Sequence, residues 1–403
     1  MADKDDKPMS PTPFTIDVPQ EKLDRILHRV REFPWPAETV DSGWALGPDP
    51  DWLRDFCRYW IEAYDWRGVE ARLNELPHFR AEADGLALHY VHCRSPRPDA
   101  TPLLLVHGWP GSFIEFEDMI GPLTDPAAHG APEAPAFHVV APSLPGYAFS
   151  DKPPAPIGPR RMAGHIAALM GGVLGYDGYI AQGGDWGSVI CGWIGHDHAA
   201  GERRGGCGAV HLNMFGVRPS QEREGGGIEP VPPQTEEEEA WRRKGARWRM
   251  KEGGYFHVQA TKPEALAYAM LDSPVGVAAW IGEKFRTWID GQQASLDRVI
   301  GRERLLTNLM LYIVNDAFGS ASWTYYGYGQ AGDSLLPPGG RVTVPTGIAN
   351  FPREIIPFPP RPYVEKGYNV AHWTDMPRGG HFAAMETPDL LLADIRAFAS
   401  AIG

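Results

Sequence analysis

The stretch Gly183-Gly184-Asp185-Trp186-Gly187 decides the fold of this chain. It follows a strand-like segment at residues 177–182 (DGYIAQ) and precedes a segment at 188–193 (SVICGW) that begins like a buried helix. A strand, a tight turn and a helix in this order form a nucleophile elbow, whose central side chain stands free at the tip of a sheet. The elbow needs small residues two positions before and two after the nucleophile, where Gly183 and Gly187 stand. A carboxylate, Asp185, occupies the place of the usual serine.

The pentapeptide alone is equally compatible with a glycine-rich turn whose aspartate caps a helix. A second segment favours the elbow. Residues 107–112 (HGWPGS) follow the apolar run 102–106 (PLLLV) and lead into a helical stretch at 113–120. Such a loop supplies a backbone N–H group to an oxyanion hole. We therefore predict one donor from Trp109 and a second from Trp186, directly after the nucleophile. We expect His107 to bond within its own loop and not to act in catalysis.

A third segment supplies a base. His381 lies between a predicted strand at 369–375 and a predicted helix at 388–401, so it faces the elbow across the strand tips. For the acid we choose Glu354, because it follows the strand-like segment 341–345 (RVTVP). Asp375 and Glu386 are the weaker candidates. The order Asp185, acid, His381 is that of the α/β-hydrolase fold.

These motifs resemble those of the microsomal-type epoxide hydrolases of the α/β-hydrolase superfamily. The likeness covers almost the whole chain, from an amino-terminal region at about 14–79 through HGWPGS and GGDWGS to GGHFAAMETP. It implies an α/β fold, with a mostly parallel eight-stranded sheet flanked by helices, a helical lid and an N-terminal extension of helices and loops. The implied boundaries are a flexible tail at 1–13, the extension at 14–78, the core at 79–216 and 341–403, and the lid at 217–340.

The resemblance also implies two lid tyrosines that bind the epoxide oxygen. By motif context they are Tyr255 and Tyr325, although Tyr326 and Tyr328 crowd the second position and could shift its register. We further expect the substrate to contact four aromatic residues, namely Trp186, Phe256, Tyr326 and Phe382.

The chemistry of an epoxide explains these residue types. A carboxylate at Asp185 can attack a ring carbon and form an ester without prior activation. A tyrosine hydroxyl, with a pKa of about 10, can donate to the departing ring oxygen at neutral pH. His381, supported by Glu354, can then take a proton from the water that attacks the ester carbonyl. No cofactor or metal is required for these steps.

Two other classes of function remain open. Haloalkane-type dehalogenases share an aspartate nucleophile and can use a tryptophan such as Trp186 to hold halide. The lid tyrosines favour an epoxide, because its oxygen needs a proton donor. A hydrolase-like protein that only binds hydrophobic molecules is less favoured, since such proteins usually lose one of the catalytic residues.

Composition limits the partners. The 403 residues are 43% hydrophobic and carry a net charge of -13, which argues against nucleic acid or an anionic membrane surface. Four scattered cysteines suit a reducing cytoplasm, and no apolar run is long enough for a signal core or a membrane anchor. We expect a cytoplasmic enzyme whose partners are a small hydrophobic epoxide and water. A homodimer and a role in detoxification are among the options that the sequence leaves open.

Periodicity locates the remaining elements. Helices are predicted at residues 20–32 and within 49–76, and strands at 87–91, 137–142 and 208–212. Strand signals vanish between about 217 and 340, where Thr235 can cap a helix that starts with four glutamates. Because this stretch is rich in aromatic residues, we expect an aromatic or aliphatic epoxide as substrate.

Overall fold

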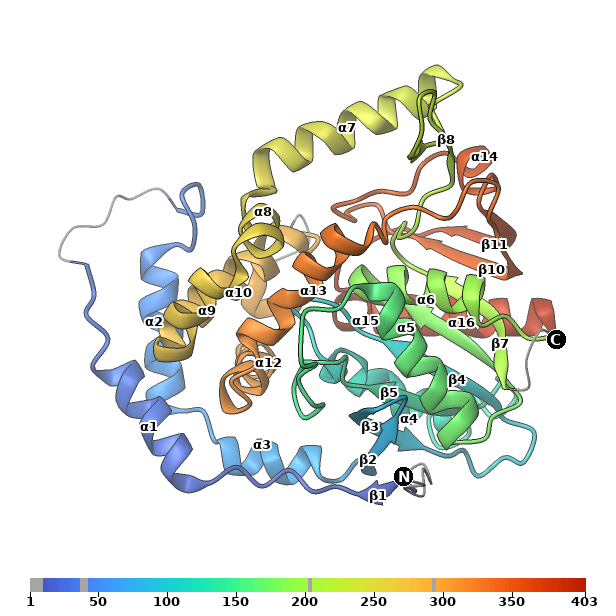
Figure 1. The fold of residues 1–403 in the computed structure, drawn as a ribbon. Coiled ribbons are helices and arrows are strands. Elements are labelled where there is room, and N and C mark those ends of the chain that lie inside the picture. Colours follow the sequence, from blue (N-terminus) through green and yellow to red (C-terminus); the bar gives the residue numbers. More distant parts are fainter. Residues whose placement is uncertain (1–9, 37–42, 202–204, 292–294) are drawn as a thin grey trace, which may run out of the picture.

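A nine-stranded sheet forms the centre of the molecule (Figure 1). The structure is a computed structural model, and it describes residues 10–36, 43–201, 205–291 and 295–403. In spatial order the strands are β1 (Thr12–Pro13), β2 (His78–Ala83), β3 (Leu86–Cys93), β5 (Phe137–Pro142), β4 (Thr101–Val106), β6 (Gly178–Gly183), β7 (Gly206–Leu212), β10 (Val342–Asn350) and β11 (Tyr368–Asp375). The pairings from β1 to β5 are antiparallel and all the others are parallel.

The prediction of a mostly parallel sheet flanked by helices is confirmed, but the sheet has one strand more than expected. The additional strand β1 pairs Thr12 with Arg80 and Pro13 with Phe79. These two residues fall within the segment predicted to be a flexible tail, whose residues 1–9 lie outside the described residues. Two residues are too few to show an alternating pattern, so the sequence gives no strand signal here.

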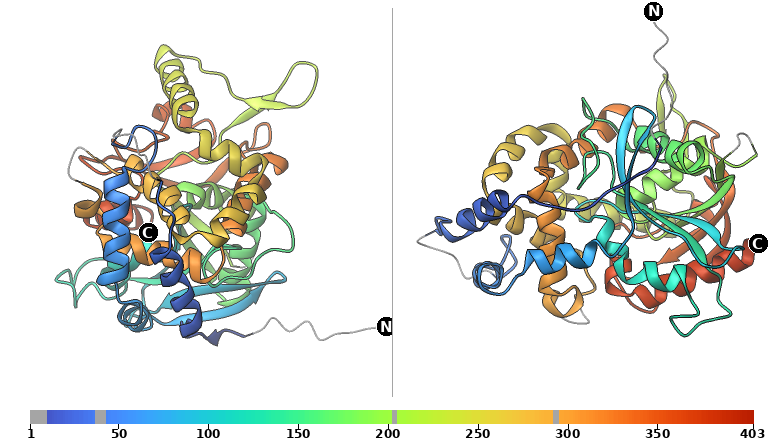
Figure 2. Two further views of the ribbon diagram at one scale, coloured as in Figure 1. Left: turned by 90° about the vertical axis from the view of Figure 1, so that its left-hand side faces the viewer. Right: turned by 90° about the horizontal axis from the view of Figure 1, so that it is seen from below.

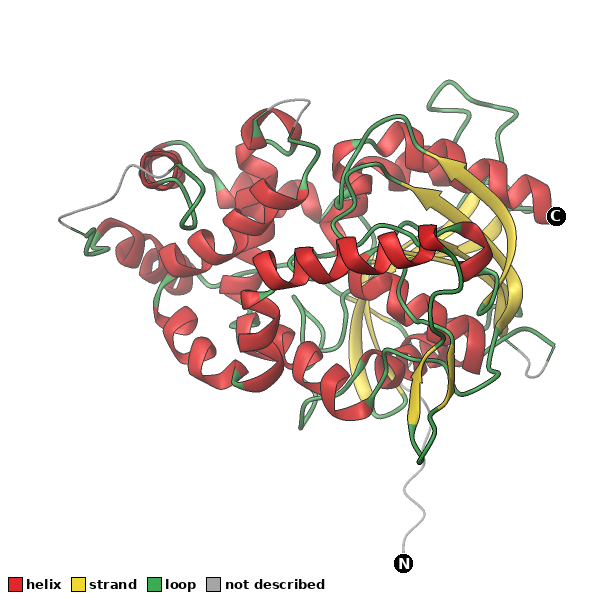
Figure 3. Ribbon diagram, turned by 90° about the horizontal axis from the view of Figure 1, so that it is seen from above, coloured by secondary structure: helices red, strands yellow, loops and turns green. Residues whose placement is uncertain are grey.

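Helices cover both faces of the sheet, as Figure 3 shows. Helix α5 (Pro159–Ala167) packs against α6 (Asp185–Asp197), and α4 (Glu117–Thr124) packs against α16 (Pro388–Ile402). The central strand β4 is therefore apolar on both sides, and Leu103 to Val106 are all fully buried. Shorter helical segments complete this part: η1 (Phe113–Phe116), η2 (Ala168–Val173), α14 (Arg361–Val364) and α15 (Ala383–Glu386).

In the described parts of the chain between β7 and β10, there are seven helices, which extend away from the strands (Figures 1 and 3). They are α7 (Glu236–Glu252), α8 (Gly254–Thr261), α9 (Pro263–Asp272), α10 (Pro274–Trp288), α11 (Leu296–Val299), α12 (Arg302–Val314) and α13 (Phe318–Ala331). As predicted, Thr235 caps α7, since its Oγ1 accepts a hydrogen bond of 3.2 Å from the Glu238 N–H group.

The expectation that this stretch holds no strand is wrong. A small antiparallel hairpin of β8 (Ser220–Glu222) and β9 (Ile228–Pro230) precedes α7. Gly225, Gly226 and Gly227 all have positive φ between the two strands. The glycine-rich composition that hid the strands is therefore what permits their turn.

The N-terminal extension contains α1 (Gln20–Arg31), α2 (Pro50–Glu62) and α3 (Trp66–Leu73), which lie beside the lid helices in Figure 2. Helices α1 and α2 pack against α10, and α1 also packs against α12. Among the described residues, no helix combines the length and apolar composition needed to cross a bilayer.

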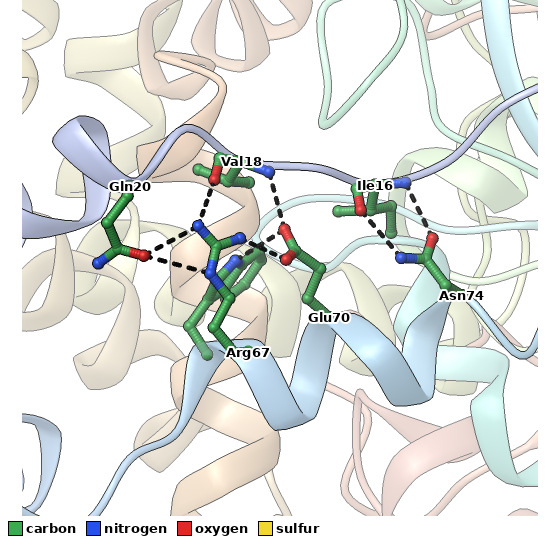
Figure 4. A network of polar contacts seen from close by, with 7 residues as sticks. Ile16, Val18, Gln20, Arg67, Glu70 and Asn74 are labelled. Atoms are coloured by element: carbon green, nitrogen blue, oxygen red, sulfur yellow. Dashed lines mark hydrogen bonds and ion pairs between the residues drawn. The ribbon is translucent and has the colours of Figure 1, made fainter.

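Paired hydrogen bonds hold the extended segment before α1, residues 16–18, against helix α3 and the residue that follows it, Asn74 (Figure 4). Ile16 exchanges two hydrogen bonds of 2.9 Å with the Asn74 amide. The Val18 N–H group donates to Glu70 Oε1 at 2.8 Å, while Arg67 donates to the Val18 carbonyl at 2.8 Å. These contacts satisfy the backbone of an extended segment that has no strand partner at this point.

Candidate active site

Asp185 lies at the turn between β6 and α6 with φ of +49°, in the left-handed region that a non-glycine residue rarely adopts. The glycines around it have no room for side chains. A Cβ atom on Gly183 would lie 2.4 Å from the Gly187 carbonyl, and one on Gly187 would lie 1.9 Å from the Val106 carbonyl oxygen. The steric requirement predicted for an elbow is thus met by the two glycines that the sequence indicated.

The loop after β4 holds one oxygen of this carboxylate. The Trp109 N–H group donates to Asp185 Oδ1 at 2.7 Å. A Cβ atom on Gly108 would lie 2.3 Å from the same oxygen, so glycine is required here. His107 donates from Nδ1 to the Gly108 carbonyl at 3.0 Å and accepts from the Leu144 N–H group at 3.2 Å, which is a structural role. The second predicted donor, the Trp186 N–H group, stays a prediction.

His381 and Glu354 complete a line of three charged groups. His381 Nε2 lies 3.2 Å from Asp185 Oδ2, and its Nδ1 lies 2.9 Å from Glu354 Oε1. Glu354 follows the end of β10, as expected, and its side chain is fully buried. Burial alone would lower the pKa of His381, but the charges of Glu354 and Asp185 raise that pKa well above its usual value. The resting imidazole therefore carries a proton between two carboxylates.

Two tyrosines from the helical lid face the nucleophile. Tyr255 on α8 stacks on Trp109 with ring centroids 5.4 Å apart, and Tyr325 on α13 meets Trp186 edge to face at 4.7 Å. Burial raises the pKa of both hydroxyls, and the negative charge of Asp185 raises it further. Both side chains therefore stay protonated at neutral pH and can donate hydrogen bonds.

The tyrosines and Asp185 open into a cavity of about 960 Å³. Its wall is mainly aromatic and aliphatic, and includes Trp186, Val189, Met214, Phe215, Trp241, Trp248, Phe256, Tyr328, Ile356 and Tyr363. Phe256 and Trp186 thus line the cavity, as predicted for substrate contacts. Tyr328 was not assigned this role, although its ring lies 5.0 Å from that of Trp186.

Two predicted substrate contacts are not at this cavity. Tyr326 lines a separate surface groove with Lys262 and Trp323, because it points about 100° around α13 from Tyr325. Phe382 stacks on Phe285 with ring centroids 4.0 Å apart, is buried, and lines a smaller cavity together with Asp185 and His381. Tyr325 lines the large cavity together with Asp185, whereas Tyr326 does not, so the geometry favours Tyr325 as the second lid tyrosine.

A second, much smaller cavity also touches Asp185 and His381. Its volume of about 20 Å³ exceeds the roughly 10–15 Å³ that one water molecule requires. Besides Asp185 and His381, the polar side chains in its wall are those of Glu115, Gln182 and Asn213. Gln182 donates to Asn213 at 2.8 Å, whereas its own Oε1 is buried with no partner among the described residues. That oxygen is free to accept a hydrogen bond from water.

Glu115 is a site residue that the sequence reasoning missed. Burial raises the pKa of Glu115 from 4.5 to about 8, and the positive charge of His381 offsets only part of this rise. The carboxyl group is therefore neutral at neutral pH and can both donate and accept a hydrogen bond. The sequence feature that could have indicated this role is the carboxylate of Glu115 within the otherwise apolar segment 113–116 (FIEF), directly after the HGWPGS loop.

No group of three or more metal-binding side chains comes together in the described parts of the chain. The four cysteines Cys57, Cys93, Cys191 and Cys207 are all free. The expectation that the chemistry needs no metal or cofactor stays a prediction.

Comparison with known proteins agrees with this arrangement. Residues 11–116 match the family model of the epoxide hydrolase N terminus, and residues 101–203 match that of the alpha/beta hydrolase fold. Epoxide hydrolase 1 of Sus scrofa is 34% identical over 96% of this chain and 88% of its own length. The chain belongs to the epoxide hydrolases of the α/β-hydrolase superfamily.

Solved structures support the same assignment. The epoxide hydrolase of Aspergillus niger is 32% identical and superposes with a TM-score of 0.82, covering 98% of this chain and 97% of that one. The juvenile hormone epoxide hydrolase of Bombyx mori is 26% identical, with a TM-score of 0.83 and coverage of 98% and 95%. These matches do not favour the dehalogenase alternative, and they make the protein an enzyme that hydrolyses epoxides.

The pKa of Glu115 gives a prediction on stability. The raised value means that the wild type loses stability as pH increases from about 4.5 to about 8, because the unfolded chain releases a proton that the folded chain retains. Glu115→Gln removes this titration. The free energy of unfolding of the variant, relative to wild type, should rise over this range by on the order of a few kcal/mol, since one pKa unit corresponds to about 1.4 kcal/mol.

Urea denaturation at a series of pH values measures this difference. Glu75→Gln, at an exposed position of the N-terminal extension, serves as the control and should follow the wild type. A difference between Glu115→Gln and wild type that stays constant with pH would contradict the raised pKa.

Proposed function

We propose that this enzyme opens apolar aryl or alkyl epoxides through a covalent ester on Asp185, which activated water then hydrolyses to a vicinal diol. The observation that carries the proposal is the position of the Asp185 carboxylate. It lies between the Trp109 N–H group and the His381 imidazole, and it faces a cavity with two tyrosine hydroxyls. An epoxide ring bound in this cavity would have the nucleophile on one side and the proton-donating tyrosines on the other.

In the first step, Asp185 Oδ2 attacks a ring carbon while Tyr255 and Tyr325 donate hydrogen bonds to the ring oxygen. The carbon–oxygen bond of the ring breaks and the oxygen becomes an alkoxide. Asp185 loses its negative charge when the ester forms. Because that charge helps to raise the pKa of His381, the pKa falls and the imidazolium releases its proton. This proton balances the one that the alkoxide takes up through the tyrosines.

In the second step, neutral His381 is the base. It takes a proton from water, whose oxygen attacks the ester carbonyl carbon of Asp185, and Glu354 stabilises the imidazolium that forms. The oxyanion at this carbon is adjacent to the Trp109 N–H group, which already donates to Asp185 Oδ1 in the resting state. The small cavity beside Glu115 and Gln182 supports a defined place for this water. Collapse of the intermediate releases the diol and restores the carboxylate.

The aromatic wall of the large cavity supports an apolar substrate. Location, assembly and physiological role rest on the sequence alone. A cytoplasmic location, a homodimeric assembly and a role in detoxification stay predictions from the composition and the family.

Trapping of the ester tests this proposal. His381→Asn removes the base of the second step but not the nucleophile of the first. Incubation with styrene oxide should therefore increase the mass of the intact protein by one substrate molecule, on the peptide that contains Asp185. The double variant Asp185→Asn/His381→Asn is the control and should gain no mass. An adduct on another residue, or none in the single variant, would refute the mechanism.

The tyrosines give a second prediction. Tyr255→Phe and Tyr325→Phe should each lower the rate of ester formation by on the order of 10²-fold, because each removes a proton donor at the ring oxygen. Tyr326→Phe is the matched control, since Tyr326 lies outside the large cavity, and its rate should stay near that of wild type. Stopped-flow tryptophan fluorescence under single-turnover conditions can measure these rates. Equal rates in all three variants would exclude the tyrosines from the first step.

A further inference from the structure

A buried lysine of α10 contacts one of the two lid tyrosines. Only 8% of Lys284 is exposed, and its Nζ atom lies 4.8 Å from the centroid of the Tyr255 ring. Lysine is seldom buried, because an ammonium group loses hydration when water is excluded. The ester mechanism proposed above assigns this group no role. Lys284 is thus a buried cation at the ring of a proton donor.

An ion pair within the same helix holds this ammonium group. Lys284 Nζ contacts Glu283 Oε2, and the other carboxylate oxygen of Glu283 accepts a hydrogen bond of 2.8 Å from Thr287. Consecutive residues of a helix point in different directions, so an ion pair between them requires the two side chains to bend toward each other. The ammonium group is thereby in contact with both a carboxylate and the Tyr255 ring.

The second lid tyrosine lacks such a cation. Over the part of the chain that the structure describes, no Lys or Arg lies over the Tyr325 ring. The neighbours of this ring are aromatic, namely Trp109, Trp186 and Phe256. The two tyrosines therefore line the same cavity but differ in the charge at their rings.

Other groups around Tyr255 oppose its role as a proton donor. Burial raises the pKa of its hydroxyl, and three carboxylates raise it further: Asp185, Glu354 and Glu283. A hydroxyl with a strongly raised pKa gives up its proton less readily to a developing alkoxide. A cation at the ring acts in the opposite direction, since it stabilises negative charge on the phenol.

The contact between Lys284 and Tyr255 changes in strength during the reaction. The attraction of a cation to an aromatic ring depends on the negative charge at the face of the ring. When Tyr255 donates to the opening epoxide, its oxygen gains negative charge, and part of this charge is delocalised into the ring. The contact is then stronger than in the resting enzyme. An interaction that strengthens toward the transition state increases the rate, whereas one of constant strength does not.

We infer that Lys284 is a positioning residue that acts through Tyr255. Its ammonium group holds the ring and stabilises the negative charge that reaches the ring as the epoxide opens. The inference rests on the proposed function, since it requires Tyr255 to donate to the ring oxygen. It gives the two tyrosines unequal tasks, because Tyr255 donates with the support of a cation and Tyr325 donates without it.

Removal of the cation tests this inference. Lys284→Met keeps an unbranched side chain of similar length without the charge, and should lower the rate of ester formation from styrene oxide by about tenfold. The rate of ester hydrolysis should not change, because Tyr255 has no part in the second step. Glu283→Gln/Lys284→Met should give the same two results, and it leaves no carboxylate unpaired in the interior. Stopped-flow tryptophan fluorescence under single-turnover conditions separates the two rates.

A double-mutant cycle shows whether Lys284 acts through the hydroxyl of Tyr255. In a Tyr255→Phe background, Lys284→Met should have no further effect on ester formation, since the ring then has no oxygen that gains charge. In a Tyr325→Phe background, the same substitution should still lower the rate by about tenfold. A lysine with a merely structural role would lower the rate by the same factor in every background.

Two matched controls leave this cation in place. Glu283→Gln retains an amide oxygen that accepts a hydrogen bond from the ammonium, and its rate of ester formation should not fall below that of wild type. Lys366→Met removes a lysine with the same geometry elsewhere, since Lys366 Nζ lies 4.8 Å from the Tyr363 ring centroid and pairs with Glu238 at 3.1 Å. The Tyr363 hydroxyl donates to a backbone carbonyl at 2.7 Å, so this variant should hydrolyse styrene oxide like wild type.

Several outcomes would overturn the inference. They are unchanged ester formation in Lys284→Met, a loss that affects both steps alike, an equal loss in either control, and a tenfold loss that persists in the Tyr255→Phe background. Failure of the proposed function would look different. The wild type would then form no ester with styrene oxide, or Tyr255→Phe would form it at the rate of wild type.

Discussion

The position of one carboxylate governs the rest of the structure. Asp185 keeps a positive φ, accepts a hydrogen bond from Trp109 and faces the protonated His381. Each contact imposes a condition elsewhere. The elbow excludes side chains at Gly183 and Gly187, the loop excludes one at Gly108, and the imidazolium requires a buried Glu354 at its other nitrogen. The sheet satisfies all these conditions together. The loops that carry these groups follow the parallel strands β4, β6, β10 and β11, so they meet where the carboxyl ends of these strands lie side by side.

In the proposed mechanism, the same carboxylate also determines the order of the two chemical steps. While Asp185 is charged, it helps to keep His381 protonated and unable to act as a base. Formation of the proposed ester would remove this charge, and the imidazole would then be available as a base for the water. In the proposed mechanism, the first step thus prepares the base of the second without any movement of the backbone. In that mechanism, the carboxyl group of Glu354, 2.9 Å from His381 Nδ1, stabilises the imidazolium that forms in the second step.

Much of this site could be predicted from the sequence because its motifs specify backbone geometry. The glycines at 183, 187 and 108 mark places where the backbone approaches too closely for a side chain, so the positions of Asp185 and Trp109 could be predicted from local sequence. The positions of Glu354 and His381 followed from strand order. The family resemblance supplied Tyr255 and Tyr325, which no local pattern would have revealed on helices α8 and α13.

The differences between expectation and structure share a physical cause, since each concerns the direction or burial of a side chain or a very short element. The helical turn directs Tyr326 into a separate surface groove, and Phe382 stacks on Phe285 and lines the small cavity beside Asp185, not the large one. Glu115 was missed because its importance depends on burial between the loop and His381, which no sequence pattern encodes. Strand β1 depends entirely on its partner β2, and two residues carry no periodicity.

The most direct test of the central claim is the source of the oxygen in the first diol released. With enzyme in excess over styrene oxide in H₂¹⁸O, the ester mechanism transfers an oxygen atom of Asp185 to the product, while the solvent oxygen enters the carboxylate. Mass spectrometry of the diol should therefore find no label after a single turnover. A diol that carries ¹⁸O in this first turnover would mean that water attacks the epoxide directly, and would contradict the account.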